Sequence, residues 1–382
     1  MNPENAPRAA FPVEEYQERI AKVQDWMAEQ GLDLLFLTQP EHFNWLTGYD
    51  PTSIFYFQGV AIAADRSREP ILLCNQAERV LCRETCRLDR ISWIWTYEDQ
   101  IAHLVELLRE EGLEDGMRLG LNLSSYNLKP AYVFELKDAL PQVELVDVAR
   151  EVDDLRLVKT PREIAYLRKA AYMADLGATA GINAAREHAT DREVMAEIQH
   201  SLALNGSEFC AYPGIVDARG SLHGTAIGKT LREGDVVLIE VTGVCRRYHC
   251  NIVRSIAIGS ASEEARRFFE IVERTHFGAL DLLRPGTTSE EIVEFSQREL
   301  GEYGKENWGR FGFGMEISYP PIWIGALSLM KTDPHVLEPG IVLTLETGIM
   351  ADFGTPFLGT NVLVTENGPE ILNNVPMELF VR

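Results

Sequence analysis

The first 150 residues alternate between helix-like and strand-like hydrophobic patterns. Apolar side chains recur at helical spacing over residues 13–30, and Gly31 follows as an expected C-terminal stop. A second helical pattern covers residues 100–111. Short apolar runs of strand length occur at residues 34–38, 60–64, 71–74, 118–121 and 143–147. This alternation predicts an α/β domain.

Two capping boxes begin a region of longer helices. Thr160-Pro161-Arg162-Glu163 combines an N-cap, a Pro at the first helical position and a Glu that reaches back to the cap, and it predicts a helix to about residue 187. Residues 190–193 repeat the capping box. Further helices are predicted at 261–283 and 289–303, with strand-like segments between and after the helix pairs. We therefore expect two domains, residues 1–155 and 156–382.

A weak internal repeat places a glutamate at the end of two apolar runs. Residues 231–240 and 337–346 share Leu, Gly, three aliphatic positions and a terminal Glu at the same offsets, so each turn leads into a strand that ends in Glu240 or Glu346. An uncompensated charge inside an apolar run is costly, so both carboxylates need partners. Two interpretations remain open: buried Arg or backbone N–H groups satisfy each one separately, or both converge on one ligand-binding cavity.

Composition narrows the classes of partner. The chain has 382 residues with 36 basic and 58 acidic side chains, a formal net charge of −22. This charge disfavours nucleic acids and anionic membranes as partners, and it is typical of proteins kept soluble at high salt. Apolar runs stay strand-sized, and residues 1–11 lack the pattern of a signal peptide, so we expect a cytoplasmic location.

The six cysteines predict no metal site. They match no zinc pattern of paired C-x-x-C, and they are too few for a disulfide framework. The most suggestive group is Cys245, His249 and Cys250. If one continuous strand carries them, Cys245 and Cys250 point to opposite faces and cannot share an ion.

Several of these segments together resemble a known family. The C-terminal region, residues 152–368, resembles the pita-bread fold of methionine aminopeptidase, prolidase and creatinase, and the preceding domain resembles that of the creatinase and prolidase branch. The matching stretches are residues 155–159 with 163–164, 231–240, 312–316, 337–346 and 362–368. The resemblance implies an α/β fold (α+β in its second half), with a creatinase-like N-terminal domain followed by a pita-bread catalytic domain.

The resemblance also implies where metal ligands would lie. Metallopeptidases of this fold hold two metal ions with two Asp, one His and two Glu. The corresponding positions here are Glu240, Asn251, Phe311, Glu346 and Gly359. Phe and Gly supply no ligand atom, so we expect neither a metal nor any other cofactor. Creatinase uses carboxylates and a histidine without metal, and the matching histidine is His223.

The expected substrate is a small delocalised cation. Planar N–H donors of a guanidinium or amidinium match carboxylate oxygens. The pattern resembles the ectoine hydrolases more than creatinase, which has histidines where this chain has Phe311 and Gly359. Residues 44–49 and the aromatic Phe55 and Tyr56 resemble the loop that closes over that active site, which implies a homodimer and cation–π contacts. Ordinary core packing is the alternative interpretation of this aromatic cluster.

The resemblance implies roles for the site residues. Glu346 would hold the amidine N–H groups, Glu240 would activate water or attack the amidine carbon, and His223 would carry the proton to the leaving amine. Asn251, Phe311 and Tyr319 are expected to contact the substrate in the same pocket, and either Arg219 or Arg310 is nominated for the substrate carboxylate. Two rival functions remain: a creatinase-like amidinohydrolase for another guanidinium or amidinium substrate, and a non-catalytic binding protein.

Overall fold

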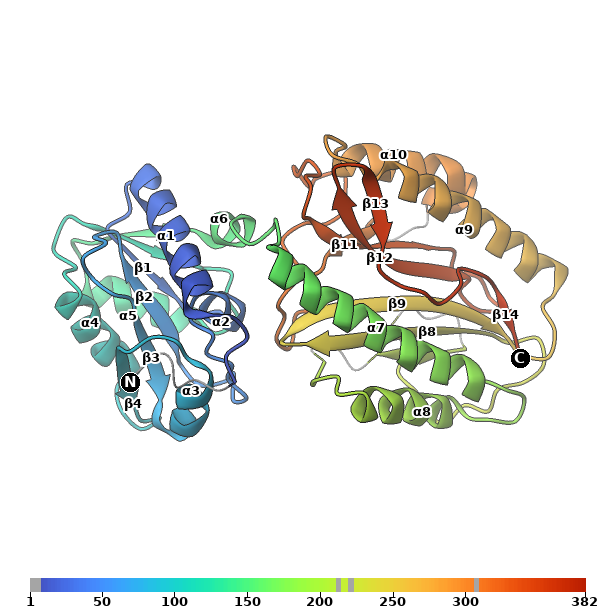
Figure 1. Ribbon diagram of the computed structural model, residues 1–382, viewed down its shortest axis with the longest axis horizontal. Helices are drawn as coiled ribbons and strands as arrows, with labels where there is room; N and C mark the ends of the chain where they lie inside the picture. Colours follow the sequence, from blue (N-terminus) through green and yellow to red (C-terminus); the bar gives the residue numbers. More distant parts are fainter. Residues whose placement is uncertain (1–7, 211–213, 219–222, 306–308) are drawn as a thin grey trace. The chain divides into compact units, whose positions relative to one another are not determined.

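The computed structural model divides the chain into two compact units, Met1–Arg156 and Leu157–Arg382 (Figure 1). It describes residues 8–210, 214–218, 223–305 and 309–382. The division lies one residue beyond the boundary expected from the capping-box pattern. No helix in these described ranges is long and apolar enough to cross a membrane.

The first unit contains a mixed six-stranded sheet with the order β4-β3-β2-β1-β5-β6. β2 pairs antiparallel with both β1 and β3, and the other neighbours are parallel. Its strands are β1 (Leu34–Leu37), β2 (Gly59–Ala63), β3 (Ile71–Asn75), β4 (Ile91–Ile94), β5 (Arg118–Leu121) and β6 (Glu144–Asp147). β1 and β2 are buried along their whole length, as continuous apolar runs predict.

The helices of this unit include one that corrects an expectation. They are α1 (Val13–Gln30), α2 (Pro40–Thr47), α3 (Arg79–Thr85), α4 (Gln100–Glu110), α5 (Pro130–Ala139) and α6 (Ala149–Asp154), with a 3₁₀ turn at Gln76–Glu78. Residues 44–47, expected in a closing loop, form the second half of the fully buried helix α2. Gly48 ends α2 in the left-handed conformation, and Tyr49 is buried. That segment is therefore core rather than loop.

The second unit confirms the predicted fold class. In its described residues, eight strands form a curved sheet with the central order β10-β11-β12-β9-β8-β7, while β13 pairs with β12 and β14 pairs with β9. All pairs are antiparallel except β9 with β14. The strands are β7 (Ile215–Asp217), β8 (Val236–Cys245), β9 (Tyr248–Ala257), β10 (Gly312–Gly314), β11 (Val342–Gly348), β12 (Phe357–Thr365), β13 (Gly368–Ile371) and β14 (Phe380–Val381).

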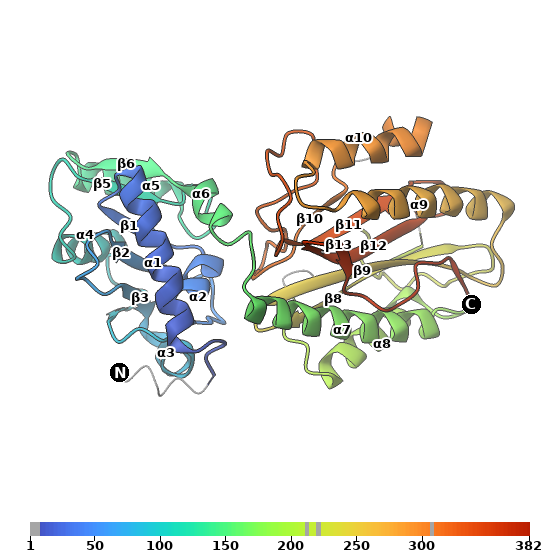
Figure 2. The same ribbon diagram turned by 45° about the horizontal axis from the view of Figure 1, so that its top comes forward.

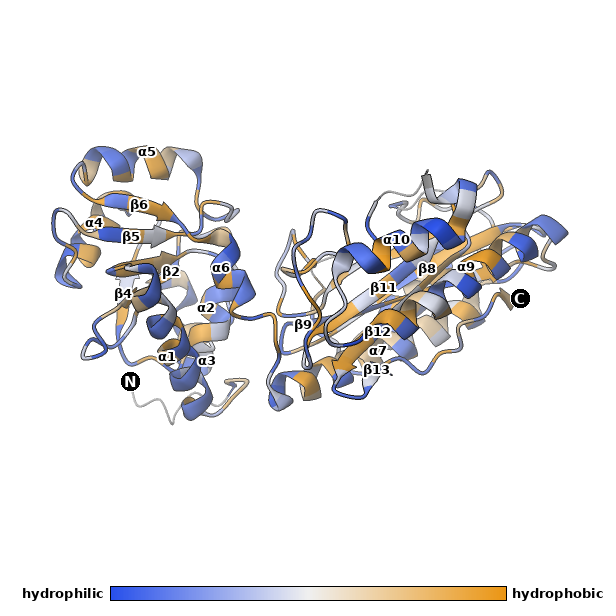
Figure 3. Cartoon of the chain, turned by 90° about the horizontal axis from the view of Figure 1, so that it is seen from above, coloured by the Kyte–Doolittle hydropathy of each residue, from blue (hydrophilic) through white to orange (hydrophobic). Residues whose placement is uncertain are grey.

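Two helix pairs cover this sheet. They are α7 (Pro161–Ala184) with α8 (Asp191–Leu204), and α9 (Glu263–Leu282) with α10 (Ser289–Leu300), which a 3₁₀ turn at Gly301–Lys305 follows. α7 packs on β8 and β9, and α9 packs on β11 and β12 (Figure 2). The strands are largely hydrophobic and the helices are mixed (Figure 3), as expected for helices with one buried face. Both predicted capping boxes, at Thr160 and Thr190, are formed.

The hairpin between β8 and β9 overturns the argument from one continuous strand. Arg246 and Arg247 form its turn with positive φ of 52° and 65°, and Cys245 pairs with Tyr248. Residues that pair across a ladder lie on the same face, so Cys245 and Cys250 share a face instead of opposing each other. The Cys250 thiol donates to the carbonyl of Leu167, and His249 lies on the opposite face.

Strand alternation divides the two faces of this sheet between core and site. On β8, Ile239 and Val241 belong to the hydrophobic core with α7 and α8, so Glu240 points to the other face. On β11, Leu343 and Leu345 belong to the core with α9 and α10, so Glu346 also points away from the helices. The period of two thus places both glutamates on the helix-free face.

Candidate functional site

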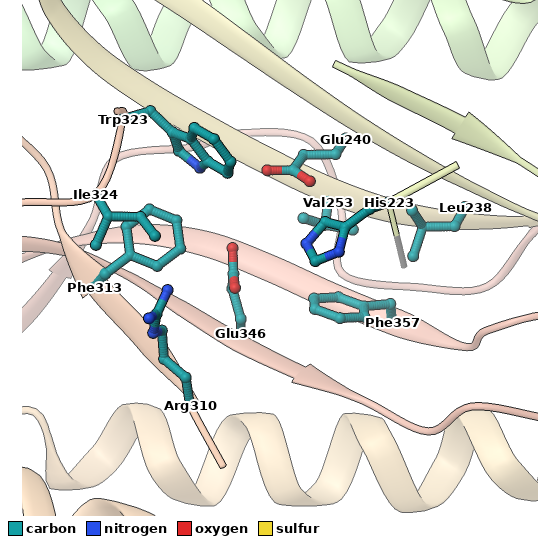
Figure 4. Close-up of a pocket in the computed structure, with 10 residues that line it drawn as sticks. All are labelled: His223, Leu238, Glu240, Val253, Arg310, Phe313, Trp323, Ile324, Glu346 and Phe357. Carbon is teal, nitrogen blue, oxygen red and sulfur yellow. The ribbon is translucent and has the colours of Figure 1, made fainter. Parts of the chain in front are cut away.

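Glu240 and Glu346 converge on one cavity in the second unit. Figure 4 shows their carboxylates directed into the same space from β8 and β11. Glu240 pairs in register with Val253 of β9, and Glu346 pairs with Gly359 of β12. Because Gly359 also pairs with Val253, the two ladders meet at the centre of the sheet. This topology confirms that the repeated glutamates are neighbours.

Asn251 links the two carboxylates. Its Nδ2 atom donates to Glu240 Oε1 and to Glu346 Oε1, each at 3.0 Å. The side chain is only 1% exposed and lies on the same face of β9 as Val253. An amide nitrogen carries two N–H groups, so one side chain can satisfy one oxygen of each glutamate. No buried Arg satisfies either carboxylate among the described residues, and the interpretation with separate partners is wrong.

Burial changes the protonation of both glutamates. Desolvation raises the pKa of Glu240 to about 7 against the opposing hydrogen bond from Asn251. Desolvation and the neighbouring charge of Glu240 raise the pKa of Glu346 to about 8, opposed by Asn251 and by the positive charge of Arg310. Two carboxylates in one dry site cannot both ionise easily, so near neutral pH the empty site retains a proton that a bound cation would displace.

The cavity around these carboxylates is small and largely apolar. Its volume is about 310 Å³, and its lining residues are His223, Leu238, Glu240, Val253, Arg310, Phe313, Trp323, Ile324, Glu346 and Phe357 (Figure 4). Low polarity strengthens each electrostatic contact inside the cavity and makes unpaired charge costly. The arrangement suits a small ligand with a flat cationic group against the carboxylates.

Only some of the expected site residues line this cavity. His223, Glu240 and Glu346 do so, and Asn251 joins the two carboxylates behind it. Phe311 is fully buried in the hydrophobic core beside α9 and α10. Its contribution to the site is the backbone carbonyl, which accepts a hydrogen bond of 2.8 Å from the amide of Glu346. The expected contact between the Phe311 ring and the substrate is therefore replaced by a positioning contact to Glu346.

The other expected contributors have different placements. Tyr319 is fully buried, with the guanidinium of Arg247 5.0 Å from its ring, and it does not line the cavity. Phe55 and Tyr56 lie in a turn of the first unit with ring centroids 4.5 Å apart, and Phe55 is 75% exposed. Their contact with substrate stays a prediction. Arg219 lies outside the described residues, whereas Arg310 lines the cavity.

Sequence reasoning missed most of the apolar lining. Leu238 and Val253 lie two residues from Glu240 and Asn251, so strand alternation alone could have placed them on the same face. Trp323 and Ile324 belong to the irregular segment after β10, and no periodic pattern signals their position. Glu316 anchors this segment: its carboxylate accepts from the amide of Ala326 at 3.1 Å and from Lys159 Nζ at 3.2 Å.

The residues present do not fit the two metal ions of the metallopeptidases. Of the five ligand positions, Phe311 and Gly359 provide no donor atom, and Asn251 turns an N–H group toward the carboxylates where a ligand would offer an oxygen. Two remaining carboxylates with raised pKa values are too few to balance two divalent cations. Among the described residues, no group of three or more His, Cys, Asp or Glu is placed to hold a metal.

Comparisons with known proteins agree with this architecture. Residues 165–366 match the profile of metallopeptidase family M24, and residues 19–158 match the creatinase/prolidase N-terminal domain. The chain is 28% identical to the Xaa-Pro dipeptidase of Pyrococcus furiosus, over 95% of this chain and 100% of the relative. It is also 28% identical to the ectoine hydrolase of Halomonas elongata, over 97% of this chain and 98% of that relative. The prolidase structure from Pyrococcus horikoshii superposes with a TM-score of 0.83 at 24% identity, over 95% of this chain and 100% of the prolidase chain.

Proposed function

The chain belongs to metallopeptidase family M24, and within this family we propose that it is a metal-independent hydrolase that opens the cyclic amidine ring of ectoine. The observation that carries the proposal is the pair Glu240 and Glu346, joined by Asn251, at a site that lacks the other metal-ligand atoms. The relatives include a dipeptidase and an ectoine hydrolase at equal sequence identity. The choice of an amidine substrate therefore rests on the side-chain groups at the site and not on sequence identity.

An amidinium complements this pair of carboxylates. Its two N–H groups lie in one plane and share one positive charge, so they can pair with carboxylate oxygens while the charge replaces the proton retained by the empty site. Apolar walls from Phe313 and Trp323 exclude water and favour a delocalised cation over a strongly hydrated one. A peptide substrate would instead need an electrophile to polarise its neutral carbonyl.

The proposed reaction adds one water across a C–N bond. Oxygen bonds to the amidine carbon, the bond from that carbon to one ring nitrogen breaks, and that nitrogen leaves as an amine after gaining a proton. The product is an N-acetylated diaminobutyrate. Glu346 holds the amidine N–H groups, Glu240 supplies the base or the nucleophile, and His223 protonates the leaving nitrogen from the same cavity.

The direct test is an ectoine hydrolysis assay followed by proton NMR. Wild-type protein should release the N-acetylated product, and Glu240→Gln should lower kcat by at least about 100-fold, the usual contribution of general acid–base catalysis. Glu338→Gln is the matched control, because Glu338 is exposed in the other half of the same turn-and-strand repeat. Creatine is assayed in parallel. Turnover of creatine without turnover of ectoine would replace this proposal with the creatinase-like alternative, and turnover of neither would favour a binding protein.

Intact-protein mass spectrometry separates the two roles of Glu240. Direct attack forms a covalent acyl-type adduct on Glu240, which a reaction quenched in the steady state should retain. Activation of water forms no adduct. The predicted homodimer and the contribution of Phe55 and Tyr56 to the closed site remain part of the proposal.

A further inference from the structure

Arg310 places a positive charge in the same cavity as the two glutamates. It is the one Arg or Lys among the described residues that line this cavity. Figure 4 shows its guanidinium pointing from the segment before β10 toward the space above Glu346. The cavity therefore presents two carboxylates and one guanidinium on its wall.

Within the described residues, part of the Arg310 guanidinium has no protein partner. Its Nε atom is buried without a hydrogen-bond partner in the described part of the chain. No ion pair or hydrogen bond joins Arg310 to Glu346, although its charge is near enough to lower the pKa of that carboxyl. Buried charges are usually paired, because desolvation without a partner is costly. A guanidinium that lines a cavity and keeps an N–H group without a protein partner can therefore donate to a ligand.

The charges of the cavity define a ligand with two opposite ends. A pure cation would be repelled by Arg310, and a pure anion would be repelled by Glu240 and Glu346. We propose that Arg310 binds the carboxylate of the substrate, so that the cavity selects compact zwitterions that carry a delocalised cation at one end and a carboxylate at the other. This inference rests on the proposed function for the cationic end, and it assigns the anionic end to a named residue.

Arg is suited to this role by its geometry. The guanidinium offers five N–H donors in a rigid fork and can hold both oxygens of one carboxylate, whereas Lys provides a single point of charge. Charge-assisted hydrogen bonds of this kind change affinity by about 10- to 100-fold. Arg310 should therefore set discrimination between ligands with and without a carboxylate, separately from the amidine contacts of Glu240 and Glu346.

The test compares ectoine with decarboxy-ectoine, the same methylated cyclic amidine without its carboxylate. Affinities are measured by isothermal titration calorimetry in a His223→Ala background, so that ectoine survives the titration. With Arg310 present, ectoine should bind about 10- to 100-fold more tightly than decarboxy-ectoine. Arg310→Met should lower the affinity for ectoine by that factor and leave the affinity for decarboxy-ectoine nearly unchanged. The ratio of the two affinities should then be close to one. Arg310→Lys should retain part of the discrimination.

Controls separate this inference from the proposed function. Arg298→Met removes the same charge from the exposed surface of α10 and should leave the ratio unchanged. If the protein hydrolyses ectoine but Arg310→Met lowers the affinities for ectoine and decarboxy-ectoine by the same factor, the role of Arg310 is overturned. The proposed function then stays intact. If ectoine binding depends on Arg310 but the wild-type protein does not hydrolyse ectoine, the zwitterion site is supported and the proposed hydrolase activity is refuted. Equal affinities for both ligands when Arg310 is present would overturn the inference.

Discussion

Asn251 and desolvation act in opposite directions on the charge state of Glu240 and Glu346. Both hydrogen bonds from its Nδ2 atom favour the ionised carboxylates, while desolvation favours the protonated forms and prevails. A cationic substrate binds best when both carboxylates are ionised. We therefore expect kcat/KM of the wild-type protein to rise with pH between about 6 and 9, as the two carboxyls lose their protons.

Removing this shared donor should move the pH profile. Asn251→Ala deletes the interaction that lowers both pKa values, so the rising limb of kcat/KM should shift to higher pH by about one unit. Asn205→Ala, at the exposed C-terminal end of α8, is the matched control. The measurement is the pH dependence of initial rates. A limb that stays in place while the rate falls at every pH would show that Asn251 only positions the site.

At the scale of single residues, the sequence predicted the charged residues of the site but not the apolar residues that line the cavity. Glu240 and Glu346 were detectable because each interrupts an apolar strand at the same offset of a repeat. Asn251 followed from the resemblance to known metal-ligand positions. Trp323 carries no comparable signal, because it lies in an irregular segment whose course depends on the buried contact between Lys159 and Glu316. These two residues are 157 positions apart in the chain, so no local pattern connects them.

Close packing of β12 on β9 favours glycine at position 359, one of the metal-ligand positions expected from the resemblance. A Cβ atom on Gly359 would lie 2.5 Å from Val253 Cγ2 and 2.8 Å from Val253 Cβ, well inside van der Waals contact. Val253 is buried in a small apolar cluster with Leu238 and Phe357. A side chain at position 359 therefore competes for space with the wall of the cavity. The absence of a side chain at Gly359 and the shape of the apolar site are therefore linked.

Gly359→Ala should destabilise the second unit by about 1–3 kcal/mol, the usual cost of overpacking a closely packed site. Gly314→Ala is the control in the same sheet, because its nearest neighbour would lie at 3.6 Å, an ordinary contact distance. Urea denaturation followed by circular dichroism measures both variants. Equal stability of the two variants would contradict the close approach of β9 and β12.

Elements with local signals were predictable, and elements that depend on tertiary context were not. Capping boxes at Thr160 and Thr190 marked the first residues of α7 and α8. The break between β8 and β9 was missed because Arg246 and Arg247 adopt positive φ, a conformation that usually requires Gly, Asn or Asp in such a turn. The resemblance to a closing loop over residues 44–49 did not indicate helix α2, whose second half covers residues 44–47.

At the scale of the molecule, the fold alone does not determine which reaction the protein catalyses. Both domains match a family that includes metal-dependent peptidases, and the prolidase structure from Pyrococcus horikoshii superposes along nearly the whole chain. Function within such a fold depends on the groups at the site. Most of the net charge of −22 is expected on the solvated surface, but Glu240 and Glu346 are a buried exception whose charge depends on what binds.

The central claim is that two carboxylates act here on a cation without a metal ion. The measurement that tests it most directly combines metal analysis of the purified full-length protein by mass spectrometry with ectoine hydrolysis before and after extensive chelation. The account predicts metal far below one ion per chain, unchanged hydrolysis after chelation, and no gain on adding divalent cations. Stoichiometric bound metal, together with activity that chelation removes and divalent cations restore, would contradict it.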